Sequence, residues 1–411
     1  MNFLFSHRNF PAQFRHILLE LSKDPDNKIV FLTNTRNNLQ IKNVQKVYYT
    51  TKREVPKNCH RYLRQYEESI IHGQAASETL IQLKNQGFRP DVIYAHMWGN
   101  SMFFKDIFPD TPLISYCEWY YNSKNSDCDF NPDIKQTYDS RAKTRCKNAQ
   151  FLLDLVSSDL GICPTNWQKA QFPKEFHNKI QVIHDGIDTS YFIPDDNAEF
   201  KIPNTDIKLS KNDNVITYAT RGMEEYRGFP EFMKAVEKLQ KTRDDLHFVI
   251  AGEDRVCYGR KLDNDTFKNK MLRELDLDLS KIHFTGSLPY GEYKKLLQIS
   301  SCHIYLTYPF VLSWSLLEAM STQCAIIASD TEPVKEVIKD NKNGLLTPFY
   351  DIEQLSQKIT YVIDNKNTKE IKEIKARARQ TIIDNYDLQK LLPRHVEMVK
   401  RTARHILHNQ L

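Results

Sequence analysis

The sequence predicts an α/β protein that contains two Rossmann-like domains, each built on a doubly wound parallel sheet. The first observation is the length, because 411 residues are more than one hydrophobic core usually organises. The second is a repeated alternation of short apolar runs with amphipathic stretches, which is typical of parallel sheets covered by helices. The third is the stretch 188–213, where this alternation stops and Asp, Asn and Pro accumulate, which indicates a domain boundary.

The first half of the chain supplies one set of strands and helices. We expect strands at residues 2–6, 28–33, 43–50, 91–95, 113–117, 160–163 and 180–184. We expect helices from Pro11 onward, from 60 to 86 and from 134 to 157. Pro11 suits the first turn of a helix, and Gly87 suits the position just after a helix end.

The second half restarts the same alternation after the boundary. We expect strands at residues 215–219, 247–251, 282–285, 302–307, 325–328 and 344–347. We expect helices at 230–241, 290–300, 313–321, 332–339 and 352–364, and throughout the last 45 residues. The expected division is therefore a first domain at 1–190, a linker at 191–212 and a second domain at 213–388. Ligands of such sheets bind beyond the carboxyl ends of the strands, so we expect both domains to face a shared cleft.

Composition restricts the class of protein. The chain contains no run of 18 apolar residues, and its start lacks the basic head and apolar core of a signal peptide. Its eight cysteines include no CxxC pair, and several lie in apolar strands, which favours reduced thiols in the cytoplasm. The same spacing gives no reason to expect a metal site.

The charge pattern has one local feature. A net charge of +5 gives no reason to expect nucleic acid as a partner. Residues 42–64 nevertheless form a basic patch, with Glu54 as the only acid among seven cations. These cations are Lys42, Lys46, Lys52, Arg53, Lys57, Arg61 and Arg64. The patch predicts either a peripheral contact with anionic lipid at the inner face of the membrane, or an ordinary solvated basic face.

Residues 302–320 combine a strand, a short loop and the start of a helix. Such an arrangement directs backbone N–H groups and the positive end of the helix dipole toward one point, and it often binds anions. Ser313 or Ser315 is expected to cap the helix. Glu318 lies farther along the helix, where a carboxylate can accept hydrogen bonds from sugar hydroxyls. The alternative is a plain strand–helix unit with a surface glutamate.

Two arginines follow the first strand of the second domain. Arg221 and Arg227 flank a loop that contains Gly222, and the planar guanidinium group suits bidentate contacts with phosphate. With the helix start near Ser313, they predict a site for a diphosphate. No DxD-like metal motif is evident, and cationic side chains can neutralise a leaving diphosphate in place of a metal. The alternative is that both arginines are solvated.

Here the sequence resembles a known family. Residues from about 160 to 350 are similar to the family 4 retaining glycosyltransferases, which have the GT-B fold. The matching segments are Ile183-His-Asp-Gly-Ile-Asp188 with Phe192 and Pro194, Arg221, Arg227-Gly228, Phe284-Thr-Gly286 through Leu297, Leu317-Glu318-Ala319-Met320 and Asn343-Gly344-Leu345-Leu346. The resemblance of the first domain is weaker and rests on its strand pattern and the loop at His96.

The resemblance implies a role for each matching residue. Glu318 is expected to hydrogen-bond the ribose of a nucleotide sugar, and Arg221 and Arg227 are expected to hold its diphosphate. His96 takes the position of the acceptor-side histidine, so the residues expected at the reaction centre are His96, Arg221 and Arg227. The remaining donor-binding residues are expected to be Gly222, Leu312, Ser313, Trp314 and Ser315. As in other GT-B enzymes, the helix at 389–411 is expected to pack back on the first domain.

One position departs from the family pattern. The first glutamate of the E-x7-E motif should stand eight residues before Glu318, where this chain has Phe310. Either the backbone of 311–314 holds the donor, or another acid replaces the missing carboxylate, or the enzyme is degenerate. The candidate acids are Glu118, Asp185, Glu253 and Asp254. The aromatic run 119–121 is expected either to stack against an acceptor sugar or to pack in the core.

The expected function is transfer of a sugar, with retention and without a metal or other cofactor. The donor is a UDP-, GDP- or similar nucleotide sugar, and the acceptor is a hydroxyl of a glycan, a lipid-linked molecule or a protein. The expected process is the synthesis of surface polysaccharide or glycoconjugate. The alternative, favoured by Phe310, is a weakly active or inert binder of nucleotide sugars or glycans. A phosphorylase or epimerase of the same fold is a more distant alternative.

Overall fold

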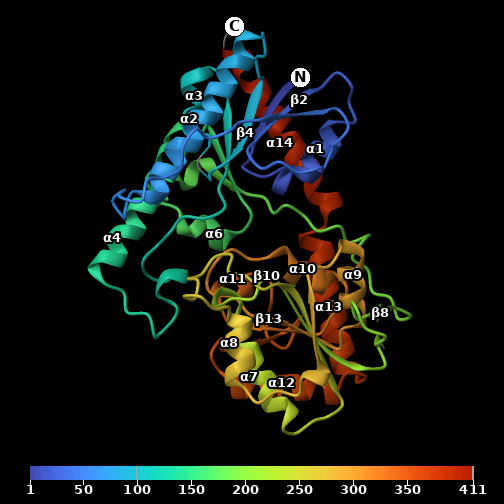
Figure 1. Cartoon of the computed structure of the whole chain (residues 1–411). Coiled ribbons are helices and arrows are strands. Elements are labelled where there is room, and N and C mark those ends of the chain that lie inside the picture. The colour runs from blue at the N-terminus through green and yellow to red at the C-terminus, as the bar shows by residue number, and fades with distance from the viewer. Residues whose placement is uncertain (99, 410–411) are drawn as a thin grey trace. The chain divides into compact units, whose positions relative to one another are not determined.

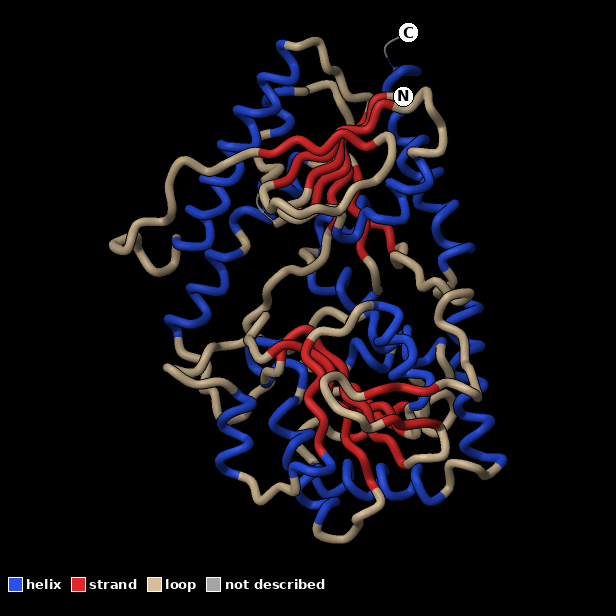
Figure 2. Tube along the Cα trace, turned by 45° about the vertical axis from the view of Figure 1, so that its right-hand side comes forward, coloured by secondary structure: helices blue, strands red, loops and turns tan. Residues whose placement is uncertain are grey.

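The computed structural model describes residues 1–98 and 100–409. The chain forms two compact units (Figure 1). The first unit is Met1–Gly186 together with Gln389–Leu411, of which residues 99, 410 and 411 lie outside the described part, and the second unit is Ile187–Leu388. Each unit is a parallel sheet enclosed by helices, as Figure 2 shows. The predicted fold class is therefore confirmed.

The sheet of the first unit has seven parallel strands in the order β3-β2-β1-β4-β5-β6-β7. The strands are β1 (Asn2–Ser6), β2 (Lys28–Thr33), β3 (Val44–Tyr48), β4 (Val92–His96), β5 (Leu113–Tyr116), β6 (Leu160–Cys163) and β7 (Ile180–Val182). The strand order reverses direction between β1 and β4. In an open α/β sheet this reversal opens a crevice at the carboxyl ends of the two strands, where ligands bind.

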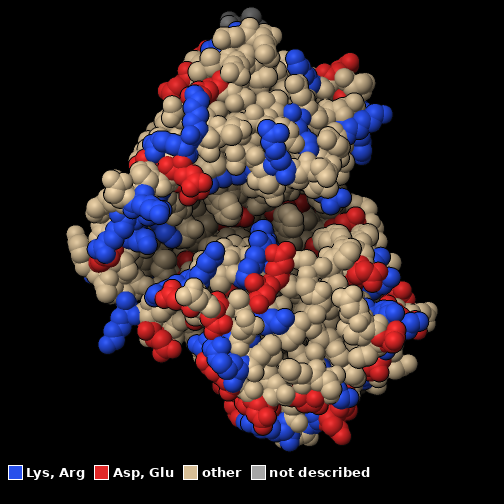
Figure 3. Space-filling view, in the orientation of Figure 1, with Lys and Arg blue, Asp and Glu red and all other residues tan. Residues whose placement is uncertain are grey.

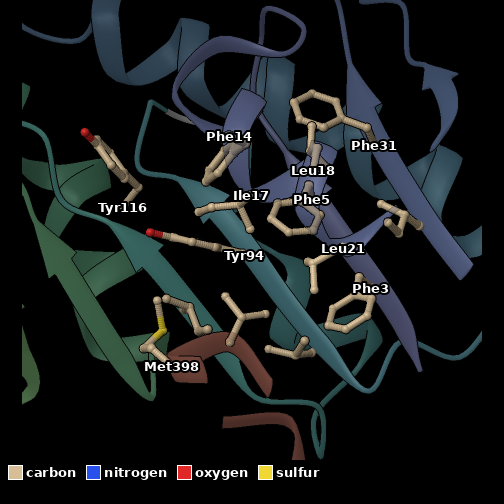
Figure 4. Close-up of a cluster of buried hydrophobic side chains, with 14 of the residues drawn as sticks. Phe3, Phe5, Phe14, Ile17, Leu18, Leu21, Phe31, Tyr94, Tyr116 and Met398 are labelled. Carbon is tan, nitrogen blue, oxygen red and sulfur yellow. The ribbon is translucent and has the colours of Figure 1, made fainter. Parts of the chain in front are cut away.

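Helices cover both faces of this sheet. They are α1 (Arg15–Leu21), α2 (Arg64–Asn85), α3 (Phe104–Ile107), α4 (Tyr138–Lys147), α5 (Ala149–Ser157), α6 (Asn166–Gln171) and α14 (Leu388–Asn409), with 3-10 turns η1 (Ala12–Phe14), η2 (Asp127–Asp129) and η3 (Lys174–Lys179). Neighbouring strand residues point to opposite faces, so Phe3 and Phe5 pack in one core while Leu4 packs in the other. Figure 4 shows the first of these cores, to which α14 contributes Met398.

The sheet of the second unit has six parallel strands in the order β12-β11-β10-β13-β14-β15. The strands are β10 (Asn214–Gly222), β11 (Leu246–Glu253), β12 (Ile282–Gly286), β13 (Cys302–Tyr305), β14 (Ile326–Ser329) and β15 (Leu345–Thr347). Its helices are α7 (Phe229–Gln240), α8 (Phe267–Glu274), α9 (Tyr290–Ile299), α10 (Trp314–Ser321), α11 (Glu332–Lys335), α12 (Ile352–Asp364) and α13 (Lys369–Asn385), with turns η4 (Glu225–Arg227) and η5 (Leu279–Lys281). Here the order reverses between β10 and β13.

The predicted linker at 191–212 is wrong, because these residues are part of the second unit. They contain an antiparallel hairpin of β8 (Glu199–Lys201) and β9 (Lys208–Ser210). Phe200 and Leu209 are buried in a core cluster with Leu296 and Ile299 of α9. These strands are only three residues long and lie among polar residues, so the sequence lacks the alternation of apolar and polar residues that predicts a strand.

Several element boundaries also differ from the sequence prediction. The helix expected at 134–157 is divided into α4 and α5 at Asn148. The Asn148 amide hydrogen-bonds both the N–H and the carbonyl of Tyr121, so it is committed to a neighbouring loop. The final helical stretch is divided into α13 and α14. None of the helices in the described part of the chain is long and apolar enough to cross a membrane.

Candidate functional site

The strand reversal in the second sheet brings two loops together. β10 ends at Gly222 and continues into η4 and α7, and β13 continues through residues 306–313 into α10. β10 and β13 are neighbouring parallel strands, so both loops leave the same edge of the sheet. The residues that the sequence singles out lie on or next to these two loops: Arg221 near the end of β10, Arg227 in η4, Ser313 at the start of α10 and Glu318 within α10.

Arg227 joins the two loops from the inside. Its guanidinium donates to Thr307 Oγ1 at 2.8 Å, to the Tyr305 hydroxyl at 3.3 Å and to the Val311 carbonyl at 3.2 Å. The side chain of Arg227 is buried, with 7% of the residue exposed, and it lies over the ring of Tyr258. The alternative that both arginines are solvated is therefore wrong for Arg227, whose guanidinium hydrogen-bonds the loop after β13. Its expected contact with a diphosphate stays a prediction.

Arg221 is the exposed arginine of this edge. Its side chain forms no hydrogen bond or ion pair with any residue that the structure describes. Gly222, which follows it, makes room for the loop after β11, since a Cβ there would lie 2.5 Å from the Arg255 carbonyl oxygen. The close approach of that loop explains the glycine, and Arg221 remains available for an anion.

Glu224 is a site residue that sequence reasoning missed. Its carboxylate is fully buried and accepts backbone N–H bonds from Cys257 at 3.1 Å, Tyr258 at 3.0 Å and Gly259 at 2.7 Å. A buried carboxylate needs several donors, and these three fix the loop after β11 beside the loop after β10. The sequence shows only that an acid stands in a glycine-containing loop. It does not show that backbone N–H groups of the loop after β11 would surround that acid.

Phe310 is a packing residue at the edge of the same sheet. It is 4% exposed, and its ring lies 5.2 Å from that of Tyr258 and 5.5 Å, edge to face, from that of Tyr226. Tyr226 in turn stacks on Tyr308 at 4.7 Å. The position at which the family resemblance places a carboxylate is thus occupied by an apolar ring inside an aromatic cluster.

The start of α10 has the expected cap. Ser313 is the N-cap residue, and its hydroxyl accepts hydrogen bonds from the backbone N–H and the hydroxyl of Ser315. The Ser313 N–H itself donates to the Tyr305 hydroxyl at 2.9 Å. Leu312 is buried and Trp314 is 39% exposed. The positive end of the α10 dipole therefore lies at the loop that Arg227 holds.

Glu318 is a buried carboxyl group rather than a surface one. Burial raises its pKa to about 7, and this effect is partly offset by the hydrogen bond from Tyr290 and by the nearby hydroxyl of Tyr293, both on α9. The Tyr290 hydroxyl donates to Glu318 Oε1, and the half-exposed Tyr290 ring stacks on Tyr191 at 5.8 Å. Tyr290 and Tyr191 were not predicted, because only the tertiary structure brings α9 and residue 191 together.

A second polar cluster lies at the strand reversal of the first sheet. His96 is the last residue of β4, and it is fully buried. Its Nε2 lies 3.5 Å from Glu118 Oε2, and its ring is stacked on Tyr116 at 5.1 Å. The rings of His7 and Trp98 lie 4.7 Å and 4.9 Å from the His96 ring. The predicted His96 and the candidate acid Glu118 are therefore neighbours.

The buried polar atoms of this cluster are incompletely paired. Both ring nitrogens of His96, Glu118 Oε2 and His7 Nε2 lack a hydrogen-bond partner among residues 1–98 and 100–409. Burial, with a further effect from His96, holds the pKa of His7 well below its usual value, so His7 is neutral near pH 7. Burying polar atoms without partners is costly, and such clusters therefore occur mainly at functional sites.

The other candidate acids have different surroundings. The Tyr116 hydroxyl donates one bifurcated hydrogen bond to the two carboxylate oxygens of Asp185, at 3.0 and 2.8 Å, so Asp185 lies beside the His96 cluster. Glu253 pairs with Arg255 and Ser287, and Asp254 accepts from Thr266. Trp119 is 2% exposed, which favours the core interpretation of the run 119–121. No group of three or more His, Cys, Asp and Glu that could hold a metal ion occurs in the described ranges.

Sequence comparisons identify relatives of both units. The family model described as "Glycosyl transferase family 4 group" matches residues 25–192, and that described as "Glycosyl transferases group 1" matches residues 202–381. An uncharacterised glycosyltransferase from Methanocaldococcus jannaschii is 27% identical over 178 residues. This match covers 43% of the chain and 42% of the relative, so the chain aligns with under half the length of that protein.

Structural comparisons give relatives of the whole fold. Sucrose-phosphate synthase from Thermosynechococcus elongatus superposes with a TM-score of 0.71 at 11% identity, covering 98% of each chain. Anabaena HepE in complex with UDP-glucose gives a TM-score of 0.68 at 13% identity, covering 98% of this chain and 100% of HepE. Identities this low show a shared fold alone. Together with the two family models, they show that the chain belongs to the family 4, group 1 glycosyltransferases, which have the GT-B fold.

Proposed function

We propose that the protein transfers a sugar from a nucleoside diphosphate sugar to a hydroxyl acceptor, with retention of configuration and without a metal ion. The observation that carries this proposal is the edge of the second sheet at β10 and β13. There Arg221, which has no partner among the described residues, the capped start of α10 and the buried Glu318 lie next to two loops that Arg227 connects by hydrogen bonds. A cation, a helix N-terminus and a carboxyl group match a diphosphate and a ribose.

Each group has a distinct task in the proposed reaction. Arg221 and the α10 dipole neutralise the diphosphate as the bond between the sugar and the phosphate oxygen breaks. Glu318 and Tyr290 accept and donate hydrogen bonds at the ribose hydroxyls. The acceptor oxygen forms the new bond on the face from which the phosphate departs, and its proton passes to the leaving phosphate oxygen. The UDP-glucose complex of HepE, a protein of the same fold, supports a nucleotide sugar as the donor.

The first unit supplies the groups proposed for the acceptor. Trp98 is 36% exposed, and an aromatic face of this kind stacks on a sugar ring. Beside it, the unpaired atoms of His96 and Glu118 can bind hydroxyl groups. This chemistry suits a sugar hydroxyl of a glycan, of a lipid-linked molecule or of a glycoprotein, in the synthesis of surface polysaccharide or another glycoconjugate.

The test begins with binding and ends with turnover. Thermal-shift measurements with UDP-, GDP-, ADP- and TDP-sugars identify the donor, and release of the nucleoside diphosphate with and without EDTA measures turnover. Replacing Arg221 by Ala is expected to weaken nucleotide binding by about 10- to 100-fold, because a charged hydrogen-bonding group is lost. Proton NMR of the product sugar then reports its anomeric configuration.

Two outcomes would contradict the proposal. If the wild type and the Arg221→Ala variant bound the nucleotide with equal affinity, the proposed diphosphate site at the end of β10 would be wrong. If EDTA abolished turnover and a divalent ion restored it, the proposed metal-independent mechanism would be wrong. Arg255→Ala serves as the control, because Arg255 is an exposed arginine on the neighbouring loop and is paired with Glu253.

A second function is favoured by one observation. Phe310 fills the position of the missing carboxylate with a packed aromatic ring, so a donor sugar meets no acid there. The protein would then bind nucleotide sugars or glycans without transferring them. Saturable binding of a nucleotide sugar with no nucleotide release, across a panel of glycan and lipid-linked acceptors, would support this function over transfer.

A further inference from the structure

Three of the seven cations in the basic patch predicted at residues 42–64 are paired with acids in the folded protein. Lys52 pairs with Glu78 at 2.7 Å, Arg53 pairs with Glu67 at 2.7 Å, and Arg61 pairs with Asp139. Lys46 donates to the carbonyls of Asn37 and Leu39. Within residues 42–64 the only acid is Glu54. Folding places further acids, from α2 and α4, next to three of the cations.

A different surface of the first unit retains its charge. We call it the α4–α5 surface, and it consists of Tyr138, Arg141, Lys143, Arg145, Leu152, Leu153 and Val156. α4 has no buried residue. The side chains of Arg141, Lys143 and Arg145 form no hydrogen bond or ion pair with the residues that the structure covers. Asp139, the acid of α4, is already paired with Arg61 and Tyr62. In Figure 3, Lys and Arg side chains gather over the region that α4 occupies in Figure 1.

The same surface exposes large apolar side chains. Tyr138 is 79% exposed and Val156 is 69% exposed, and Leu152 and Leu153 are also exposed. Single exposed apolar residues are common, but here Leu152, Leu153 and Val156 of α5 follow three cations of α4 that have no partner in the described part of the chain. Asn148, between the helices, also has α-helical backbone angles, so the turns of α4 and α5 follow one another closely.

The spacing places cations and apolar residues along one stripe. Tyr138, Arg141, Arg145, Leu152 and Val156 follow one another at intervals of three, four, seven and four residues. The intervals within α4 and within α5 are those of one helical face, and the seven-residue interval spans Asn148 between the two helices. Helices that lie in a membrane interface typically carry Arg and Lys on their polar face and aliphatic residues on their apolar face.

We propose that the α4–α5 surface docks on an anionic membrane. Arg141 and Arg145, one turn apart on α4, contact lipid phosphates, and Leu152, Leu153 and Val156 of α5 enter the boundary between headgroups and acyl chains. Tyr138 lies at the headgroup level, where its ring is shielded and its hydroxyl is hydrated. The exposed aliphatic residues favour lipid over nucleic acid, whose phosphates would satisfy the cations and leave these residues in water.

The inference goes beyond the proposed transfer reaction and does not depend on it. It concerns where the protein is held, and a catalytically inert binder would dock in the same way. The expected attraction is moderate, because each cation near an anionic surface contributes about fivefold to the binding constant and salt screens the effect.

Co-sedimentation of the full chain with lipid vesicles tests the proposal. We expect binding to vesicles of phosphatidylcholine mixed with phosphatidylglycerol, and at least about tenfold weaker binding to pure phosphatidylcholine vesicles or at high salt. The double variant Arg141→Glu, Arg145→Glu is expected to lose binding to the mixed vesicles. Val156→Asp is expected to lower it severalfold by placing a charge in the apolar part.

A matched control separates this surface from the patch at 42–64. Lys42→Glu with Lys57→Glu makes the same charge change at exposed patch residues and is expected to leave vesicle binding nearly unchanged. Circular dichroism and thermal unfolding confirm that each variant is folded. The proposal is overturned if the wild type does not bind mixed vesicles, or if the control loses binding while the α4 variant keeps it. It is equally overturned if single-stranded RNA displaces the vesicles and binds more tightly.

Discussion

Glu318 is the residue whose environment has the clearest consequence. Its carboxyl group is buried on α10, next to the hydroxyls of Tyr290 and Tyr293, and burial raises its pKa to about 7. A folded-state pKa above the ordinary glutamate value of 4.5 means that the folded protein binds this proton more tightly than the unfolded chain does. The stabilisation from the bound proton is therefore complete at low pH and is lost as the pH rises toward 7.

Replacing Glu318 by Gln is expected to remove this pH dependence. The neutral amide still accepts a hydrogen bond from Tyr290. It does not ionise, so it carries no free-energy cost for a buried charge. Between about pH 4.5 and pH 8, the unfolding free energy of the variant should rise relative to the wild type by up to about 3 kcal/mol. Denaturant unfolding at both pH values measures the difference, and Glu332→Gln, an exposed acid on α11, is the control. A difference that stays constant with pH would mean that folding does not raise the pKa of Glu318.

The charged residues at the candidate site are of two kinds: some are exposed and available to a ligand, and others are buried and hold the loops in place. Arg221 is exposed and unpaired, while Arg227 and Glu224 are buried and turned toward backbone groups of adjacent loops. The sequence identified both arginines by residue type, but it could not distinguish them, because their difference lies in the partners that β13 and β11 supply. Phe310 is understood in the same way, as one member of an aromatic cluster.

At the level of elements, the loop after β13 depends on Arg227. Replacing Arg227 by Met keeps an apolar stem but leaves Thr307 Oγ1 and the Val311 carbonyl without their donor. Buried polar groups that lose a charged partner cost about 2–4 kcal/mol in unfolding free energy, and the amides of 306–313 should exchange hydrogen faster. Urea unfolding and hydrogen-exchange mass spectrometry measure the two effects.

Arg221→Met is the matched control for this prediction. Arg221 makes no internal hydrogen bond within the described structure, so its loss should change stability by less than about 0.5 kcal/mol. Its effect is expected on nucleotide affinity instead. If Arg227→Met left both the stability and the exchange of residues 306–313 unchanged, the supporting role of Arg227 would be rejected.

At the level of the whole molecule, α14 ties the end of the chain to its beginning. Met398 and Val399 of α14 lie in the core cluster of the first unit, together with Phe3 and Phe5 of β1. The first unit is therefore assembled from residues 1–186 and the segment after 388, while the second is formed by the chain between them. The expected packing of this segment on the first domain agrees with these contacts.

Replacing Met398 by Ala is expected to destabilise the first unit alone. Removing a buried methionine side chain costs about 2–5 kcal/mol through lost burial and the cavity left behind. Differential scanning calorimetry should show a lower transition temperature for one unit and an unchanged transition for the other. Arg401→Ala, at an exposed position of the same helix, should shift neither transition. A uniform shift of both would show that the units unfold as one.

The sequence by itself determined the fold class, the number of domains and the edge of the second sheet at which the candidate site lies. These follow from local periodicity and from short motifs around Arg221 and Glu318, which are properties of neighbouring residues. Only the tertiary structure decided that Arg227 supports a loop, that Glu118 lies beside His96, and that acids from other helices pair with three cations of the patch at 42–64. The physical reason is that burial, hydrogen-bond partners and ion pairs depend on residues far apart in the chain, whose approach no local pattern records.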